Sequence, residues 1–124
     1  MIGLIKKIFG TKNDREVARI QKTLIPQVYA YEEQLSAMSD EDLRAQTKEW
    51  QEELGAIEDD QQLAHRLDEL MPMAFAVVKE GAKRLCGKYV EVRGHEILWE
   101  MVHFDVQLVG GYALHKRNIA EMAT

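Results

Sequence analysis

The sequence predicts a mainly α-helical chain with a short β-hairpin near its C-terminus. Apolar residues recur every three or four positions from Val17 to Leu35, which is the spacing of one face of a helix. Near the C-terminus, the runs 112–114 and 119–122 favour strands and flank a polar segment, 116–118. Two short strands joined by a polar turn are the pattern of a β-hairpin.

Composition places the chain among ordinary globular domains. Its 124 residues allow at most one domain with one modest core, and 46% of them are hydrophobic while 30% are charged. The net charge of −5 does not suit a nucleic-acid-binding surface, so no specific DNA partner is expected. The only cysteine, Cys86, cannot form an internal disulfide, which favours a reducing cytoplasm. A lone cysteine at a helix end is usually a small buried apolar residue.

The opening segment "MIGLIKKIFG" predicts a short interfacial helix. Its isoleucines and phenylalanine would share one face, and its two lysines lie off that face. A basic amphipathic helix of this kind lies on a membrane surface. Docking on its own domain or on a partner protein is the alternative. The candidate contact residues are Ile5, Lys6, Lys7, Ile8 and Phe9. No stretch approaches the ~20 apolar residues that span a bilayer.

The stripe from Val17 to Leu35 predicts a helix that packs on other helices. Asn13 or Asp14 can cap its start. Pro26 falls inside the pattern and removes one backbone donor, so we expect a kink or a break near residues 24–26.

Cap signals predict the next helices. In "SDEDL", Ser39 precedes Asp42 by three residues, which is close to a capping box, and Gly55 fits the end of that helix. Its expected buried residues are Leu43, Trp50 and Leu54. A further helical turn or two is expected around Leu63, Leu67 and Leu70. Pro72 suits the first position of another helix, which would end at Gly87. The residues expected to face inward there are Phe75, Val78, Ala82 and Leu85.

Residues 88–100 change in character. Tyr89, Val90 and Val92 favour extended structure, and Gly94 favours a turn. From Phe104 the apolar spacing is helical again. We expect Gly110 and the glycine after it to end this helix, before the hairpin over 112–122.

Metal and catalytic chemistry is not indicated by the residue pattern. The four histidines, His65, His95, His103 and His115, form no paired ligand spacing, and the lone cysteine has no partner. The carboxylates lie mostly on faces expected to be solvated. No metal ligand and no catalytic residue is therefore assigned.

Several stretches together resemble the SecA family of bacterial protein-translocating ATPases. They are "FGTKNDR" at 9–15, "LSAMSDEDL" at 35–43, "LMPMAFAVVKEGAKRLCG" at 70–87, and "HFDVQLVGG" at 103–111 followed by "IAEMAT" at 119–124. The pairing of the last two is the specific signature, and the resemblance covers nearly the whole chain. Residues 88–100 are an insertion relative to the shorter members and resemble a longer form of the family.

The resemblance implies the N-terminal portion of an α/β P-loop motor domain of the helicase-like type. Residues 1–35 would form N-terminal amphipathic helices that contact the membrane or channel. Residues 36–124 would begin the first nucleotide-binding domain. A parent of this family would hydrolyse ATP with Mg²⁺ and drive preproteins through the SecYEG channel.

The resemblance also implies a place in the cell and a set of partners. The parent would be cytoplasmic and peripheral on the cytoplasmic face of the inner (plasma) membrane. Its partners would be SecYEG, preproteins and anionic lipid, with the ribosome and a second copy in a homodimer as further candidates.

Met122, Ala123 and Thr124 match the first three residues of the family's phosphate-loop motif. In the family, Gly-Glu-Gly-Lys-Thr follows, and it supplies the lysine for the phosphates and the hydroxyl for Mg²⁺. We therefore expect this chain to be an N-terminal fragment that does not hydrolyse ATP by itself.

Gln107 is the candidate adenine-reading residue. A glutamine amide presents one acceptor and one donor side by side, and adenine offers a matching N6 donor and N7 acceptor. Guanine offers two acceptors at that edge. In the resembled family the glutamine at this position selects adenine, and Phe104 and Met101 match positions that pack beside the base. Without the family context, Gln107 and Phe104 would read as an ordinary helix residue and an ordinary core residue.

A non-enzymatic alternative also fits the sequence. The chain would then be a stand-alone helical module that binds a membrane surface or a protein partner through residues 1–35. The gene separates the two hypotheses, because the fragment reading requires the frame to continue into the phosphate loop.

Overall fold

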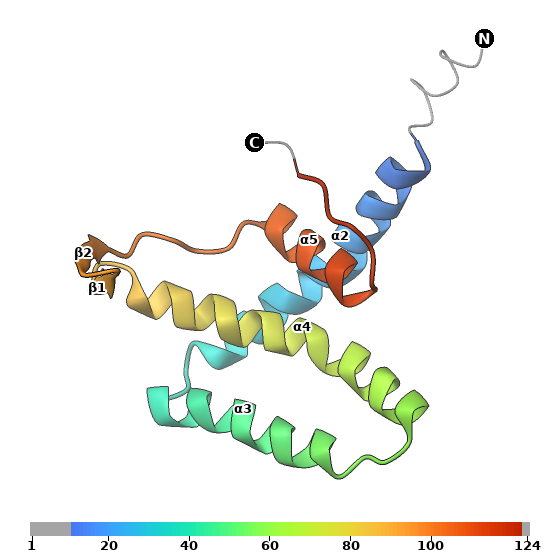
Figure 1. Cartoon of the computed structure of the whole chain (residues 1–124), viewed down its shortest axis with the longest axis horizontal. Coiled ribbons are helices and arrows are strands. Elements are labelled where there is room, and N and C mark those ends of the chain that lie inside the picture. Colours follow the sequence, from blue (N-terminus) through green and yellow to red (C-terminus); the bar gives the residue numbers. More distant parts are fainter. Residues whose placement is uncertain (1–10, 123–124) are drawn as a thin grey trace. The chain divides into compact units, whose positions relative to one another are not determined.

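The computed structural model describes residues 11–122, which form four helices and two short strands (Figure 1). Its elements are α2 (Lys12–Leu35), α3 (Asp40–Gly55), α4 (Asp60–Leu85), β1 (Tyr89–Val92), β2 (His95–Leu98) and α5 (Asp105–His115). The mainly α fold with one β-hairpin is therefore confirmed. The predicted interfacial helix of residues 1–10 lies outside the described residues.

The chain forms two compact units. One unit holds residues 27–103, and the other holds the described residues up to 26 together with those from 104 onward. The boundary within α2 falls at Pro26, where the sequence predicted a kink or a break. Helix α2 nevertheless continues through Pro26 as one helix.

Helices α3 and α4 form an antiparallel pair in the unit of residues 27–103 (Figure 1). Ser39 caps α3 as predicted, because its hydroxyl accepts the Asp42 backbone N–H at 3.1 Å. Asp59 caps α4 in the same way, with Gln62 as the donor at 2.8 Å. The end of α3 at Gly55 is also as predicted.

Two predicted helix boundaries are wrong. Pro72 does not begin a helix, since α4 runs without interruption from Asp60 to Leu85. Pro72 is buried, as are Leu70, Met71 and Ala76, and the burial of this apolar surface offsets the backbone donor that proline lacks. The start of α2 is capped by Thr11 and not by Asn13 or Asp14. The Thr11 hydroxyl accepts the Asp14 N–H at 3.1 Å, and the Asp14 carboxylate accepts the Thr11 N–H at 2.6 Å.

The inward face of α4 differs from the predicted one. Ala82 is buried as expected, but Val78 is 58% exposed and Leu85 is 37% exposed. Lys79 and Glu80 are buried at 5% exposure each. Cys86, expected to be buried, is exposed. The helix ends before Gly87, whose φ of +82° is the left-handed conformation that favours glycine after a helix.

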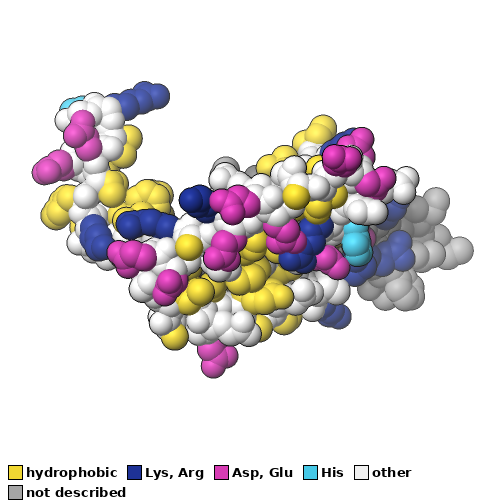
Figure 2. Space-filling model, turned by 90° about the horizontal axis from the view of Figure 1, so that it is seen from below, with side chains coloured by type: hydrophobic (Ala, Val, Ile, Leu, Met, Phe, Trp, Pro, Cys, Tyr) yellow, Lys and Arg dark blue, Asp and Glu magenta, His cyan; other side chains and the backbone are white. Residues whose placement is uncertain are grey.

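The hairpin of β1 and β2 follows α4 and is antiparallel. Its two-residue turn is Arg93 and Gly94, with φ of +52° and +81°, as a turn that matches the twist of the strands requires. At the base of the hairpin, the Gly87 N–H donates to the Trp99 carbonyl at 3.0 Å. The hairpin leaves apolar side chains exposed beside charged ones, as its arm at the left of Figure 2 shows.

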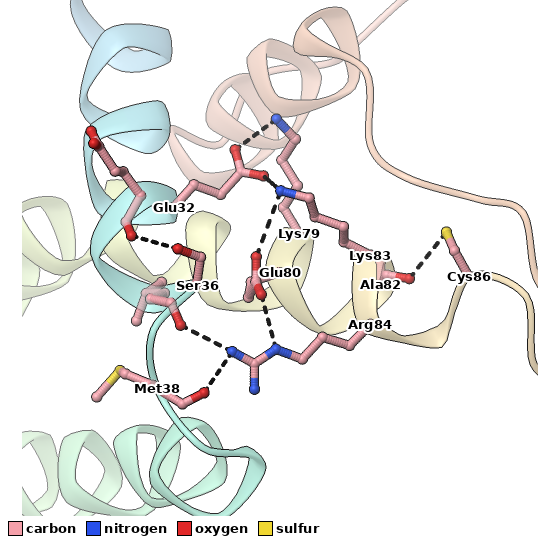
Figure 3. A network of polar contacts seen from close by, with 11 residues as sticks. Glu32, Ser36, Met38, Lys79, Glu80, Ala82, Lys83, Arg84 and Cys86 are labelled. Carbon is pink, nitrogen blue, oxygen red and sulfur yellow. Dashed lines mark hydrogen bonds and ion pairs between the residues drawn. The ribbon is translucent and has the colours of Figure 1, made fainter.

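A network of buried charges links α2 to α4 inside the unit of residues 27–103 (Figure 3). The Lys79 ammonium donates to the Glu32 carboxylate at 2.9 Å and lies 4.0 Å from the centre of the Tyr29 ring. Lys83 approaches the other Glu32 oxygen at 3.6 Å. Burial alone would lower the pKa of Lys79, but the hydrogen bond with Glu32 and the contact with Tyr29 outweigh it and raise that pKa.

Arg84 extends this network to the turn between α2 and α3. Its guanidinium donates to the Glu80 carboxylate at 2.9 Å and to Asp40 at 2.8 Å. It also donates to the backbone carbonyls of Leu35 and Met38, at 3.0 and 2.9 Å. Leu35 is the last residue of α2 and Met38 lies in the turn after it, where the carbonyls lack the regular helical partners. The sequence interpretation placed most carboxylates on solvated faces, and Glu32 and Glu80 are exceptions because both are buried.

Helix α5 replaces the hairpin that was predicted over 112–122. It continues through both glycines to His115, so the predicted stop at Gly110 is also wrong. The polar residues 116–118 do form a turn, but it is a helix C-cap. Arg117 has φ of +60° and donates to Leu114, and the Asn118 N–H bonds to Ala113 at 2.9 Å. This pair of bonds is the Schellman pattern of a helix end.

Candidate functional site

The first turn of α5 presents the two main candidate residues, Phe104 and Gln107. Phe104 is the N-cap residue, with extended backbone angles (φ −78°, ψ 156°), and Gln107 is the third residue of the helix. The Gln107 side-chain oxygen accepts the Phe104 backbone N–H at 2.8 Å. The same two residues share a backbone bond of 3.0 Å from the Gln107 N–H to the Phe104 carbonyl. The structure thus brings Phe104 and Gln107 together.

This contact is the glutamine half of a capping box, and it fixes the direction of the amide. A carbonyl oxygen carries two lone pairs, so one acceptor position remains on Gln107 beside the two protons of its amide nitrogen. Gln107 is exposed and the Phe104 side chain is 72% exposed. An exposed aromatic ring next to an oriented amide can meet a planar base by its face and its edge together.

Buried residues hold the first turn of α5 in place. Leu108, Val109 and Gly110 on α5 are buried, as are Ile20 and Leu24 on α2 in the same compact unit. The Glu16 carboxylate and the side chain of Tyr112 both hold the pKa of Arg19 above its ordinary value, which links α2 to α5 at their surface. The exposed residues of the candidate site are therefore carried on a packed helix.

A shallow hollow lies beside this turn. It is lined by Ala18, Gln21, Lys22 and Ile25 of α2 and by Asp105 of α5. Neither Phe104 nor Gln107 lines it. It is open to solvent, and its lining mixes one cation, one carboxylate and two apolar side chains.

The remaining candidate residues are divided by the structure. Met122 lies against α5, because its sulfur is 3.1 Å from the position that a Cβ on Gly110 would occupy. The other two residues of the phosphate-loop start, Ala123 and Thr124, lie outside the described residues. Met101 belongs to the other compact unit, where its carbonyl accepts the Trp99 indole N–H at 2.8 Å and its side chain is 58% exposed. Its place beside a base stays a prediction.

The candidate membrane contacts Ile5, Lys6, Lys7, Ile8 and Phe9 also lie outside the described residues. From residue 11 to residue 122, no helix combines the length and the apolar character needed to cross a membrane. Over the same range, no three His, Cys, Asp or Glu side chains gather in a way that could hold a metal ion.

Comparison with known proteins identifies the class. The sequence model of the SecA DEAD-like domain family matches residues 5–124, nearly the whole chain, so the chain belongs to this family. The resemblance drawn from its motifs is confirmed.

The particular relatives are all named protein translocase subunit SecA. The one from Pseudomonas putida strain W619 is 47% identical over 121 residues, which cover 98% of this chain and 11% of that protein. The one from Pseudomonas savastanoi pv. phaseolicola is 46% identical over the same lengths. The one from Chlamydia felis is 40% identical over 124 residues, which cover 100% of this chain and 12% of that protein. The chain thus spans about one ninth of the length of these relatives. No solved structure matches.

Proposed function

We propose that this chain supplies the adenine-recognition segment of a SecA-type ATPase that exports preproteins through the SecYEG channel. The observation that carries the proposal is the orientation of the Gln107 amide by the Phe104 N–H, at 2.8 Å, beside an exposed aromatic ring. Gln107 would accept from adenine N6 and donate to N7. Phe104 would pack on the base, and Met101 would lie near it.

The phosphates and Mg²⁺ would be bound by residues other than those of α5. The contact of Met122 with Gly110 supports a short path from the adenine-reading helix to the start of the phosphate loop at Met122, Ala123 and Thr124. Phosphoryl transfer depends on the loop's lysine and on the metal-holding hydroxyl. The 124-residue chain alone is therefore proposed to be inactive as an ATPase.

Contacts with the membrane surface are proposed for Ile5, Lys6, Lys7, Ile8 and Phe9. The working protein would then lie on the cytoplasmic face of the inner membrane, near SecYEG, preproteins and the ribosome, and it would be able to pair as a homodimer. Binding to vesicles should require anionic lipid, because each lysine near such a surface contributes about 1 kcal/mol. Equal co-sedimentation with neutral and anionic vesicles would contradict this part of the proposal.

The adenine-reading role is tested in the full-length ATPase with two variants of Gln107. Gln107→Ala removes both the cap and the base contact. Gln107→Glu keeps an acceptor for the Phe104 N–H but loses the donor for adenine N7. If the amide reads adenine, both variants weaken ATP binding by about 1–3 kcal/mol, and GTP binding changes much less. Phe104→Ala should weaken both nucleotides alike, because packing on a base face does not depend on the base edge.

The matched control is Ser39→Ala, which removes a side-chain cap from α3 in the other compact unit. It should cost about 1 kcal/mol of stability and leave the ATP-to-GTP preference unchanged. Calorimetry on all four proteins and the wild type gives the affinities. An unchanged ATP-to-GTP ratio in Gln107→Glu would leave Gln107 as a helix cap only.

A further inference from the structure

The hairpin of β1 and β2 has two open edges. Over residues 11–122 the sheet contains only these two strands, so each strand is bonded on one side alone. Val92 and His95 flank the two-residue turn, and the Trp99 N–H bonds to the Lys88 carbonyl at 2.8 Å. Because hydrogen-bonded and non-hydrogen-bonded pairs alternate along an antiparallel ladder, every second pair between the turn and Trp99 directs its backbone groups away from the partner strand. Those outward residues are Tyr89, Glu91, Glu96 and Leu98.

The same four residues share one face of the hairpin, because side chains alternate along a strand. We name this the glutamate face. Tyr89 is 69% exposed and Leu98 is 38% exposed, and both glutamates are exposed. The left arm of Figure 2 shows carboxylates next to hydrophobic side chains on the hairpin. The face thus combines apolar surface at the base with negative charge toward the turn.

Glu91 and Glu96 stand directly opposite each other across the two strands. In a pair of this type the Cα atoms are only about 4.5 Å apart, and like charges so placed destabilise a hairpin. Neither carboxylate forms an ion pair with any side chain in the described part of the chain. A cation supplied from outside would remove this repulsion.

We propose that the hairpin binds an extended polypeptide segment of another protein as a third strand. The segment places a lysine or arginine against Glu91 and Glu96, and an apolar residue two positions away against Tyr89 or Leu98. The backbone of this segment forms hydrogen bonds with one of the open edges of the hairpin. The side chains on the other face of the segment are apolar. This inference does not depend on the nucleotide proposal.

Charge favours this partner over the other occupants of an open edge. A second copy of the hairpin would bring two further glutamates beside the first two, which adds repulsion. An anionic membrane would be repelled by the glutamate face in the same way. Of these three occupants, only a cationic strand is attracted by the two glutamates and also forms hydrogen bonds with the open strand edge.

The test titrates the chain with a fluorescent probe peptide, Thr-Val-Lys-Val-Leu-Val-Thr, and follows both anisotropy and backbone amide exchange. The peptide should slow exchange at one edge, either at Tyr89 and Glu91 or at Glu96 and Leu98. Glu91→Gln with Glu96→Gln should weaken binding at least roughly tenfold, since a charge-assisted contact is lost. Glu91→Lys with Glu96→Lys should reverse the preference toward a peptide with glutamate in place of lysine.

Two controls separate strand addition from simple attraction. Glu52→Gln with Glu58→Gln removes the same charge from exposed carboxylates outside the hairpin and should leave peptide binding unchanged. A probe with N-methylated backbone amides keeps every side chain but loses its donors, and it should bind weakly.

Several results would overturn the proposal. Full binding of the N-methylated probe or of the Glu91→Gln, Glu96→Gln double variant would do so, as would the absence of any change in hairpin amide exchange. Self-association through the hairpin in sedimentation would assign the edge to a second copy. Binding of calcium alone to the two glutamates, or hairpin-dependent binding to anionic vesicles, would assign the face to those ligands instead.

Discussion

Removal of one partner from the buried pair Glu32–Lys79 should destabilise the fold strongly. Lys79→Met leaves the Glu32 carboxylate in a residue only 7% exposed, with Lys83 at 3.6 Å as its remaining cation. Breaking a buried ion pair typically costs 3–5 kcal/mol, and the remaining lysine places the expected loss near the lower end, about 3 kcal/mol. With an unfolding entropy of about 2.1 cal/mol/K per residue, this loss lowers the melting midpoint of the chain by about 12 °C.

A double-mutant cycle measures the coupling directly. Glu32→Leu should cost somewhat less than Lys79→Met, because Lys79 keeps the Tyr29 ring at 4.0 Å. The double variant should lie within about 1 kcal/mol of the wild type, since both charges are then gone and similar volumes remain. Lys83→Met is the control and should cost less than about 1 kcal/mol, because Lys83 is mostly exposed.

The assay is urea unfolding of the wild type and the four variants. The reasoning would be refuted by a loss below 1 kcal/mol in both single variants. It would also be refuted by a double variant as unstable as the two single losses combined. The pH dependence gives a second readout. Because the pKa of Lys79 is raised above 10.5 in the folded chain, the pair contributes fully below that pH and is lost as the pH rises through the folded pKa.

Two further predictions concern a glycine contact and an exposed ion pair. Gly81→Ala should stabilise the chain by up to about 1 kcal/mol, because the added Cβ meets nothing within 4 Å in the middle of α4. Gly110→Ala should not give this stabilisation, because the added Cβ would displace the Met122 side chain. The NMR methyl resonance of Met122 should shift in this variant. An equal stabilisation in both variants would contradict the contact. The Arg84 guanidinium beside Asp40 lowers the pKa of that carboxyl below 3.8, so its contribution is present above pH 3.8 and lost as the pH falls through the folded pKa. Asp40→Asn should flatten the stability profile at acid pH in urea unfolding, and an unchanged acid limb would exclude a role for this pair.

The start of α3 was predicted correctly because a cap is a local signal. Ser39 and Asp42 are three residues apart and form the predicted contact. The start of α2 was predicted too late in the sequence. Thr11 and Asp14 have the same spacing and the same chemistry as Ser39 and Asp42, and Thr11 is the cap. The end of α5 and the effects of Pro26 and Pro72 depend on what each helix packs against, and local sequence does not contain that information.

The hairpin was predicted in the wrong segment for a related reason. Tyr112 and Ile119 favour strands, yet the first lies in α5 and the second follows its C-cap. The close approach of Met122 to Gly110 gives a reason for one of the two glycines inside this helix. The strand-forming residues 89–92, by contrast, are followed by Gly94 in a turn, as expected.

The candidate site was found through the family motif and not through geometry. Phe104 and Gln107 were assigned to a base, while the hydrogen bond that joins them was missed. A detectable signal was present, since a glutamine three residues after the helix cap is the capping-box pattern. Buried Lys79 and Glu80 had no comparable signal, because charged residues at helical spacing normally face solvent.

One arginine side chain joins the ends of three helices. Arg84 of α4 bonds to the last turn of α2, to the connecting turn at Met38 and to the first residue of α3. Only a planar, five-donor group can reach these acceptors together, so lysine is not an equivalent residue at this position. Opening of the α2–α3 turn therefore breaks the Arg84 bonds to Leu35, Met38 and Asp40 together. The stability of this turn is thereby coupled to that of the last turn of α4 through a single side chain.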